Sequence, residues 1–374
     1  MSDQRGDAVP GGHLPFGLSG SEGSDAAASR RQLLKGVGLG GVAAGVLAAC
    51  GGAKKGPSSS SGGSGAHGNF PATPKFKFTF VNHATTNAFF QATRYGAEDA
   101  CALLGCSYSW TGSETQDVGQ MVKAMNAAIS SKADGIAIAL TDQNGFNAPT
   151  KNALAAGIPV VSYNADVDNG RLAYIGQDLR ASGEEVGKKI VELVPSGDVA
   201  IFIGTPGALN LQPRVDGALA AIKASGKPIN AKQVKSDVDA TKAQNAIDSY
   251  YQGAKTVKGM FGVDGTSTQG ISNVMAKYKL HDKGIKAGGY DLLPVTLQNI
   301  KSGQTDFTLD QEAYYQGFLP VVYLYMYKLS GGLLNPAETN TGLKFVTKAN
   351  VAPYLSKTTR FEGSTKDQKY VKTS

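Results

Sequence analysis

Short apolar runs alternate with amphipathic stretches along most of the chain from residue 76 onward. The runs KFTFVN (77–82), SYSWTG (107–112), GIAIAL (135–140) and IPVVSY (158–163) are predicted as buried strands, with helices near 87–104, 116–131 and 145–156 between them. Strands that are apolar over nearly their whole length and alternate with helices are typical of a parallel sheet covered on both faces. The pattern therefore predicts an α/β fold.

A second series of the same kind follows. Its runs are RLAYIG (171–176), DVAIFIG (198–204), KGMFGV (258–263) and IKAGGYD (285–291), with a more polar strand near 230–236. Helical stretches again separate the strands. About 300 residues follow residue 75, enough for two ordinary cores, so we predict two similar doubly wound parallel-sheet lobes.

The N-terminal segment has a different pattern. Arg30 and Arg31 stand in SRRQLLK ahead of a Gly- and Ala-rich apolar run over 37–49, which resembles a twin-arginine export signal. The run is too short and too weakly apolar for a stable membrane span. It ends in LAACG, which resembles the lipobox of bacterial lipoproteins, whose cysteine takes a diacylglyceryl group and becomes the new N-terminus. The resemblance implies that 1–49 is removed and that Cys50 anchors the exported protein to the outer face of the cytoplasmic membrane; the alternative is an ordinary secretory signal followed by an unrelated cysteine.

Two further segments are predicted to be loose. Residues 50–75 begin with a Gly- and Ser-rich run that cannot bury enough apolar surface to fold, which indicates a flexible tether. Residues 356–374 are polar and are expected to form a tail.

The formal net charge is +7, and the removable segment does not account for it. Residues 1–49 contain four basic groups (Arg5, Arg30, Arg31, Lys35) and four acidic ones (Asp3, Asp7, Glu22, Asp25), so the remainder keeps the excess. The lysines are scattered, without a basic stripe or a helix-turn-helix pattern, which argues against nucleic acid as a partner. We expect a basic surface that faces anionic lipid or cell wall.

The cysteines and histidines outside the N-terminal segment indicate at most a disulfide and no metal site. Cys101 and Cys106 bracket the end of a predicted helix and could form a disulfide in an oxidising compartment or remain as two buried thiols. Twin-arginine export carries folded proteins, so a disulfide would form after folding. The four histidines (His13, His67, His83, His281) show no metal-ligand spacing, so no metal or other cofactor is expected.

In open parallel sheets, ligands bind beyond the carboxyl ends of the strands. The residues at those places are amides, carboxylates, aromatic rings and one arginine: Asn87, Phe89, Phe90, Asp142 and Asn164 in the first series, and Asn210, Arg214, Asp264, Asp291 and Gln311 in the second. Carboxylates and amides pair with vicinal hydroxyl groups, and a ring face covers the C–H side of a sugar. The set predicts a site for a neutral polyhydroxy ligand.

The region from about 76 to 350 resembles the type I periplasmic sugar-binding proteins of the ribose, galactose and xylose group, the substrate-binding lipoproteins of ABC sugar importers. TTNAFF resembles that family's Asn-Pro-Phe-Phe segment with Ala88 in place of Pro, and GGYDLLP resembles its Gly-Phe-Asp segment. The resemblance gives ligand-binding places to Asp142, Arg214, Asp264 and Asp291, and the place of a hinge glutamine to Gln311.

Two departures bear on the ligand. Ribose binders carry Arg directly after the first Asp and an Asp-Arg pair after the fourth strand, whereas this chain has Gln143 and Asn164-Ala165. The loss of positive charge argues against ribose itself. Pentoses, hexoses and sugar alcohols all remain open.

Each candidate also has a purely structural interpretation. Asp142, Asp264 and Asp291 could cap helices; Arg214 could form a surface ion pair. The amides Asn164, Asn210 and Gln311 could satisfy backbone groups at crossovers. Phe89 and Phe90 are adjacent and cannot both face the core, so at least one must face the cleft. Trp110 fits a lobe core or a cleft wall equally well. Tyr163 and Tyr290 are predicted to point into the cores.

The resemblance implies two lobes with a three-segment hinge, crossing near 165–170, 310–312 and 335–342. The N-terminal lobe is then 76–168 plus 312–340, and the C-terminal lobe is 169–311 plus 341–355. A monomer of this kind would close around a monosaccharide or polyol and present it to an ABC permease. The alternatives are a sugar-sensing receptor for a membrane signalling partner and, with no nucleophile or phosphate-loop constellation in its favour, an exported enzyme.

Overall fold

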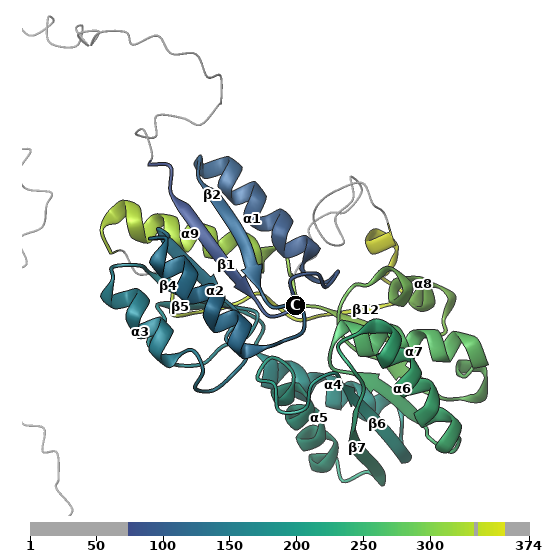
Figure 1. The fold of residues 1–374 in the computed structure, drawn as a ribbon. Helices are drawn as coiled ribbons and strands as arrows, with labels where there is room; N and C mark the ends of the chain where they lie inside the picture. The colour runs from purple at the N-terminus through teal and green to yellow at the C-terminus, as the bar shows by residue number, and fades with distance from the viewer. Residues whose placement is uncertain (1–73, 333–335, 356–374) are drawn as a thin grey trace, which may run out of the picture. The chain divides into compact units, whose positions relative to one another are not determined.

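The computed structural model describes residues 74–332 and 336–355 (Figure 1). The predicted export signal with Arg30 and Arg31, the lipidation site Cys50, residues 50–73 of the predicted tether and the predicted tail 356–374 lie outside the described residues. Within the described part, no helix is long and apolar enough to cross a membrane.

The first lobe is a six-stranded parallel sheet with helices on both faces. Its strands are β1 (Lys77–Asn82), β2 (Ser107–Gly112), β3 (Gly135–Ile138), β4 (Val160–Tyr163), β5 (Ala173–Gly176) and β11 (Glu338–Asn340), in the order β11-β5-β4-β3-β1-β2. Its helices are α1 (Phe90–Leu104), α2 (Val118–Ser130), α3 (Asn147–Ala155) and α9 (Tyr315–Ser330). One apolar cluster joins α1 and α9 to the sheet, and a second joins α2 and α3 to it.

The second lobe has the same plan. Its strands are β6 (Gly197–Ile203), β7 (Ile229–Lys235), β8 (Gly259–Gly262), β9 (Lys286–Gly288), β10 (Phe307–Asp310) and β12 (Lys344–Thr347), in the order β12-β10-β9-β8-β6-β7. Its helices are α4 (Leu179–Leu193), α5 (Gln212–Ala224), α6 (Ala240–Gly253), α7 (Gly265–Tyr278) and α8 (Pro294–Ser302), with short 3₁₀ turns at His281–Lys283 and Ala352–Leu355. The prediction of two doubly wound lobes is confirmed, except that β12 pairs antiparallel with β10.

The two lobes repeat each other in detail. The order β5-β4-β3-β1-β2 of the first sheet corresponds to β10-β9-β8-β6-β7 of the second. Beyond the corresponding strands β4 and β9, a fully buried tyrosine precedes a polar residue in the left-handed region: Tyr163 before Asn164 (φ 63°), and Tyr290 before Asp291 (φ 75°). Asn and Asp are the non-glycine residues that adopt this conformation most readily. The buried tyrosines confirm the predicted orientation of both rings.

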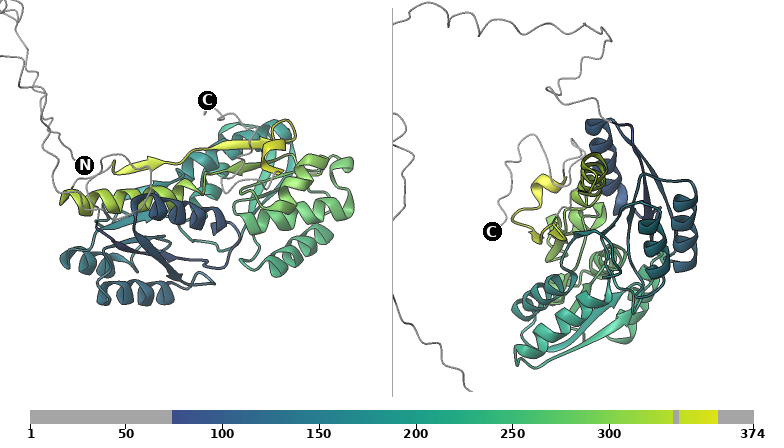
Figure 2. Two further views of the ribbon diagram at one scale, coloured as in Figure 1. Left: turned by 90° about the horizontal axis from the view of Figure 1, so that it is seen from above. Right: turned by 90° about the vertical axis from the view of Figure 1, so that its left-hand side faces the viewer.

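The structure corrects the predicted boundary between the lobes. The strand predicted to open the second series belongs to the first sheet, because β5 pairs with β4 and with β11. The first crossover therefore lies at 177–178, after β5, and not at 165–170. The other two lie at 311–314 and 341–343, close to their predicted places, and Figure 2 shows the segment with β11 and β12 running from one lobe to the other.

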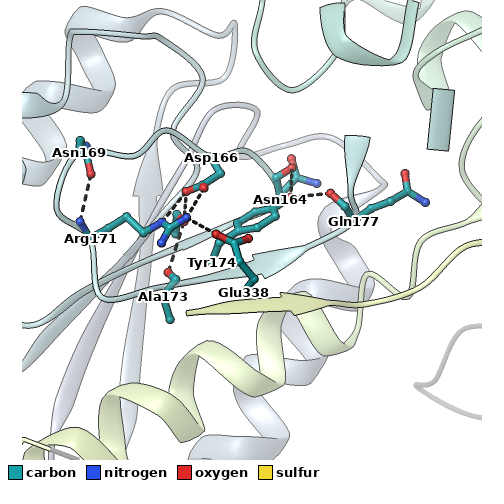
Figure 3. Close-up of polar contacts among 9 residues, drawn as sticks. Asn164, Asp166, Asn169, Arg171, Ala173, Tyr174, Gln177 and Glu338 are labelled. Atoms are coloured by element: carbon teal, nitrogen blue, oxygen red, sulfur yellow. Dashed lines mark hydrogen bonds and ion pairs between the residues drawn. The ribbon is translucent and has the colours of Figure 1, made fainter. Parts of the chain in front are cut away.

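An ion-pair cluster fixes the edge of the first sheet beside the crossovers (Figure 3). Arg171 donates from Nε to Asp166 at 2.8 Å and from a terminal nitrogen to Glu338 at 2.7 Å. The Arg171 side chain is only 9% exposed, whereas Glu338 is 66% exposed. The cluster ties the turn between β4 and β5 to β11, the strand that leads into the third crossover.

Candidate ligand-binding site

A cavity of about 440 Å³ lies between the lobes, at the carboxyl ends of the strands. This volume falls within the range of roughly 300–1,000 Å³ that is usual for small-molecule sites. Of the residues predicted to bind a ligand, the cavity is lined by Asn87, Phe89, Phe90, Asn164, Asn210, Arg214, Asp264, Asp291 and Gln311. The structure thus brings side chains from both series to one place.

Asp142 is the predicted site residue that does not line this cavity. Its Oδ1 accepts hydrogen bonds from the backbone N–H groups of Asn144 at 3.0 Å and Gly145 at 2.7 Å. A short acidic side chain commonly closes its own turn in this way. The position of Asp142 therefore does not support the prediction that it contacts the ligand. Its role is structural, but it closes a turn and does not cap α3, as the alternative interpretation had suggested.

Arg214 lies near the start of α5 and is 3% exposed. Helix α4 packs directly on the backbone there, because a Cβ atom at Gly183 would stand 2.2 Å from the carbonyl oxygen of Arg214. The guanidinium lies 4.3 Å from the ring centre of Tyr290 and donates to Gln311 at 2.9 Å and to Gln177 at 3.2 Å. Its Nε is buried without a partner among the described residues. The surface ion-pair interpretation is wrong, since Arg214 is a fixed, buried cation at the cavity wall.

Asp291 is 6% exposed, and its Oδ1 accepts a hydrogen bond from Nε2 of Gln311 at 2.6 Å. Burial raises the pKa of this carboxyl group to about 6, against the opposing effects of Arg214 and Gln311. In the free protein, the charged form of Asp291 therefore has a desolvation cost. Polar contacts to the carboxylate reduce this cost.

Three buried glutamines connect the cavity to the crossovers. Gln311 bonds Arg214 and Asp291, as described above, and it lies in the second crossover. Gln316 accepts from Nδ2 of Asn164 at 3.0 Å and donates to the carbonyl oxygen of Gln311 at 3.0 Å. Gln177, in the first crossover, accepts from Arg214 and donates to the carbonyl oxygen of Gly342 in the third at 3.1 Å. Groups that line the cavity are thus hydrogen-bonded to segments that must move if the lobes rotate.

Asp264 combines both interpretations. It caps α7 through Oδ1, which accepts from the backbone N–H of Ser267 at 2.8 Å, and its Oδ2 accepts from Gly204 at 3.0 Å and from the Ser267 hydroxyl at 2.8 Å. Burial raises its pKa. The capping role is shown, and the carboxylate also reaches the cavity wall.

The two adjacent phenylalanines differ in burial, as expected for neighbouring residues that cannot both face the core. Phe90 is 3% exposed and belongs to the core of the first lobe, whereas Phe89 is half-buried, with the two ring centres 4.8 Å apart. Trp110 stacks on Phe80 and packs against the same core, and its indole N–H donates to the carbonyl oxygen of Thr85 at 3.2 Å. Trp110 does not line this cavity. Phe89 is therefore the ring best placed to stack on a ligand.

His83 lines the cavity, and the sequence interpretation did not select it. It follows β1 directly, which was the one available signal. Asn210 Nδ2, from the second lobe, donates to its Nε2 at 3.2 Å. Burial and the charge of Arg214 lower the pKa of His83 to about 4, so the ring is neutral at pH 7. Nδ1 of His83 and Oδ1 of Asn210 are buried without partners among the described residues.

A neighbouring contact also crosses between the lobes. The backbone N–H of Leu209 donates to the carbonyl oxygen of Thr141 at 3.3 Å, and the Leu209 side chain packs against the first-lobe cluster that contains Met121 and Phe146. Together with Asn210 it forms what we call the interlobe latch, residues Leu209 and Asn210. Both contacts join the second lobe to the first beside the cavity.

Further polar residues that the sequence interpretation missed include Gln116, Asp239 and Gln269. Asp239 caps α6 through the N–H of Lys242 at 2.9 Å, and Gln269 lies on α7. Gln116 lies in the loop before α2, and nothing in the local sequence marks any of the three as a cavity residue. Among the described residues, no group of three or more His, Cys, Asp or Glu side chains could hold a metal ion.

Comparison with known proteins identifies a family and a similar sequence. Residues 78–332 match the family described as the periplasmic binding protein domain. The xylose/arabinose-binding protein XylF of Sulfolobus acidocaldarius is 46% identical over 369 residues, 90% of each chain.

Solved structures share the fold. The solute-binding protein of an ABC transporter from Burkholderia graminis, in complex with D-arabinose, has a TM-score of 0.71 at 24% identity, over 77% of this chain and 100% of that one. XylFII, in a structure of its complex with LytSN, has a TM-score of 0.68 at 25% identity, over 74% of this chain and 99% of that one.

Proposed function

The chain belongs to the periplasmic binding protein family, and from that premise we propose that it captures a monosaccharide or sugar alcohol between its lobes for an ABC transporter, with xylose and arabinose as the first candidates. The observation that carries the proposal is the cavity itself. Buried amide, carboxylate and guanidinium groups from both lobes converge on one space of sugar size. Such groups pair with the vicinal hydroxyls of a neutral polyol.

The individual roles follow from position. Asp291 would accept hydrogen bonds from ligand hydroxyls, Asn164 would face them from the opposite lobe, and Phe89 would cover an apolar sugar face. Arg214 would donate to a ring or hydroxyl oxygen from its otherwise unpaired Nε side. Asn87, Asn210, Asp264 and Gln311 complete the proposed contact set, with Phe90 supporting Phe89 from the core.

Capture proceeds by hinge closure in this proposal. A ligand that contacts both lobes binds the closed form more tightly than the open form and shifts the population toward it. Arg214 and Asp291 bond Gln311 in the second crossover, and Asn164 bonds Gln316, which donates to the backbone of Gln311. These bonds support a link between the occupied cavity and the hinge. No reacting nucleophile or acid–base pair is needed for this role.

The location and the partner are also part of the proposal. After export directed by Arg30 and Arg31, a lipid on Cys50 would hold the receptor, as a monomer, at the outer face of the cytoplasmic membrane, within reach of a permease. A signalling partner in place of the permease is the second candidate. XylFII, which is 25% identical to this chain, forms a complex with LytSN, so a protein of this fold can bind a partner protein.

A thermal-shift series tests the ligand class. We expect Tm to rise with concentration for at least one of xylose, arabinose, ribose, glucose, galactose and myo-inositol, because a ligand at 100 times its Kd stabilises the folded state by about 2.7 kcal/mol. Glycerol at equal concentration controls for nonspecific polyol effects. If no sugar or polyol raises Tm more than glycerol does, the proposed ligand class is wrong.

A further inference from the structure

Helix α1 ends in a backbone motif that brings Cys101, in its last turn, close to Cys106, which follows the helix. Gly105 adopts the left-handed conformation (φ 70°), and the backbone N–H of Cys106 donates to the carbonyl oxygen of Cys101 at 3.0 Å. This bond, from the second residue past the helix to the third residue before its end, defines a Schellman motif. The side chains of these same two positions commonly contact each other in the motif, and here both are cysteine.

The hydrogen bond also limits the distance between the two backbones. A Cα atom lies about 2.4 Å from its own carbonyl oxygen and about 1.5 Å from its own nitrogen. With 3.0 Å between oxygen and nitrogen, the Cα atoms of Cys101 and Cys106 are separated by at most about 6.9 Å, and by less along a bent path. Disulfides span roughly 4.4–6.8 Å between Cα atoms, so the backbone already has the required spacing.

The two side chains turn toward one environment. Cys101 is 5% exposed and forms part of the apolar core of the first lobe, while Cys106 is half-buried and packs against that same core. Their thiols also interact, because a hydrogen bond between them lowers the pKa of Cys106 and raises that of Cys101. Cys106 is thus both the more accessible thiol and the one more readily ionised.

We propose that Cys101 and Cys106 form an oxidation site, at which an external disulfide converts the two thiols into one intrachain disulfide. The Cys106 thiolate attacks a sulfur of the external disulfide and expels one thiolate, which gives a mixed disulfide. The Cys101 thiol then loses its proton and attacks the Cys106 sulfur, which releases the second external thiolate. Two protein thiols are oxidised, one external disulfide is reduced to two thiols, and the two protons pass to the released thiolates.

The resulting disulfide is a covalent cross-link within the first lobe. It joins the C-terminal turn of α1 to the residue before β2, which starts at Ser107. The inference does not depend on the identity of the ligand, because the cysteines lie outside the cavity. Disulfides persist in the oxidising compartments in which exported proteins work.

Peptide mapping of the wild-type protein tests the proposal directly. Trypsin cleaves after Arg94 and Lys123, so both cysteines fall in the peptide 95–123, apart from Cys50. The folded protein is incubated with oxidised glutathione. It is then denatured in the presence of N-ethylmaleimide, which alkylates any remaining free thiol, and digested with trypsin. We expect peptide 95–123 to be two hydrogen atoms lighter than its dithiol form and to carry no maleimide, whereas prior reduction should give two maleimide groups. Two maleimide groups after oxidation, or a lasting glutathione adduct, would overturn the proposal.

Two variants test the order of attack. In Cys101→Ser the half-buried Cys106 should acquire glutathione at least about 10-fold faster than the buried Cys101 does in Cys106→Ser, because accessibility and thiolate character govern the rate. Native far-UV circular dichroism of each variant ensures that a folded protein is compared. Equal rates in two folded variants would contradict the assignment of Cys106 as the attacking thiol.

Discussion

Asp291 and Asp142 each follow a strand, yet only Asp291 directs its carboxylate to the cavity. Asp291 is 6% exposed and held by Gln311, whereas Asp142 closes its own turn. The difference supports the proposed ligand contact of Asp291 and a local structural role for Asp142.

Replacing Asp291 by Asn should weaken binding of whichever sugar stabilises the protein by about 10- to 150-fold, because hydrogen bonds to a charged group contribute roughly 1.5–3 kcal/mol. Isothermal titration calorimetry measures the change. Asp142→Asn is the matched control and should leave affinity within about 2-fold of wild type. Equal losses in the two variants would place both carboxylates in the site and contradict the structure.

The raised pKa of Asp291 has a defined effect on the free protein. The pKa in the fold is about 6, above the value of roughly 3.9 in the unfolded chain. The folded state therefore binds more protons between these values, so this group favours folding below pH 4 and loses that contribution as pH rises through 6. The loss is on the order of 2–3 kcal/mol. His83, with a pKa of about 4, is already neutral above pH 5.

Ligand binding should reverse this effect and release protons near pH 6. Sugar hydroxyls that donate to Asp291 favour its charged form and lower its pKa. Calorimetry at pH 6 in two buffers of different ionisation enthalpy should show a fraction of a proton released per sugar bound, and none in Asp291→Asn. Burial also raises the pKa of Glu312, to about 7, and this residue is unchanged in Asp291→Asn. Any proton release that comes from Glu312 would therefore persist in the variant. Equal proton release by both proteins would assign the titration to another group.

The sequence predicted the kinds of side chain that line the cavity, but not which strand-end carboxylates reach it. Asp142 and Asp291 both directly follow a predicted strand, and only the direction of the side chain in the folded protein separates them. His83 was missed for the opposite reason. Its place after β1 is visible in the sequence, whereas its partner Asn210 lies 127 residues away in the other lobe.

At the scale of elements, the cluster of Arg171, Asp166 and Glu338 should contribute to stability. Arg171→Ala would leave Asp166, whose side chain is 21% exposed, without its bidentate partner and should cost about 2–4 kcal/mol. Urea denaturation measures this free energy of unfolding.

Arg180→Ala is the matched control, because Arg180 pairs with Glu184 on an exposed helix face and its loss should cost less than about 0.5 kcal/mol. Similar costs for the two arginines would mean that the cluster around the buried Arg171 side chain adds nothing beyond a surface pair.

The order and type of the predicted strands were correct, but the predicted runs 135–140, 158–163 and 285–291 are longer than β3, β4 and β9. β1 and β2 begin and end where the sequence placed them. The assignment of β5 to the second lobe failed because AYIG has the character of any buried strand, and a local pattern carries no information about which sheet it joins. The antiparallel partner β12 was missed for a related reason, since its burial is uneven and its pairing is distant in sequence.

For the whole molecule, the interlobe latch should bias the position of the lobes. Asn210→Ala removes the hydrogen bond to His83, so the free variant should populate more open arrangements and show a larger radius of gyration by small-angle X-ray scattering. Saturating sugar should restore the wild-type value. Affinity should fall about 3- to 10-fold, because a neutral hydrogen bond contributes roughly 0.5–1.5 kcal/mol.

Asn230→Ala serves as the control for that variant. Asn230 donates to Asp198 at 2.9 Å within the second lobe, so its loss should change neither the radius of gyration nor the affinity. A free Asn210→Ala protein with the wild-type radius would show that the latch does not hold the lobes together.

The repeated plan of the two lobes leaves its mark on the cavity, because Asn164 and Asp291 stand at corresponding turns after corresponding strands. One turn carries a neutral amide and the other a carboxylate. A ligand held between the two turns would therefore meet different groups at its two ends. We expect even a near-symmetric polyol to bind in one preferred direction.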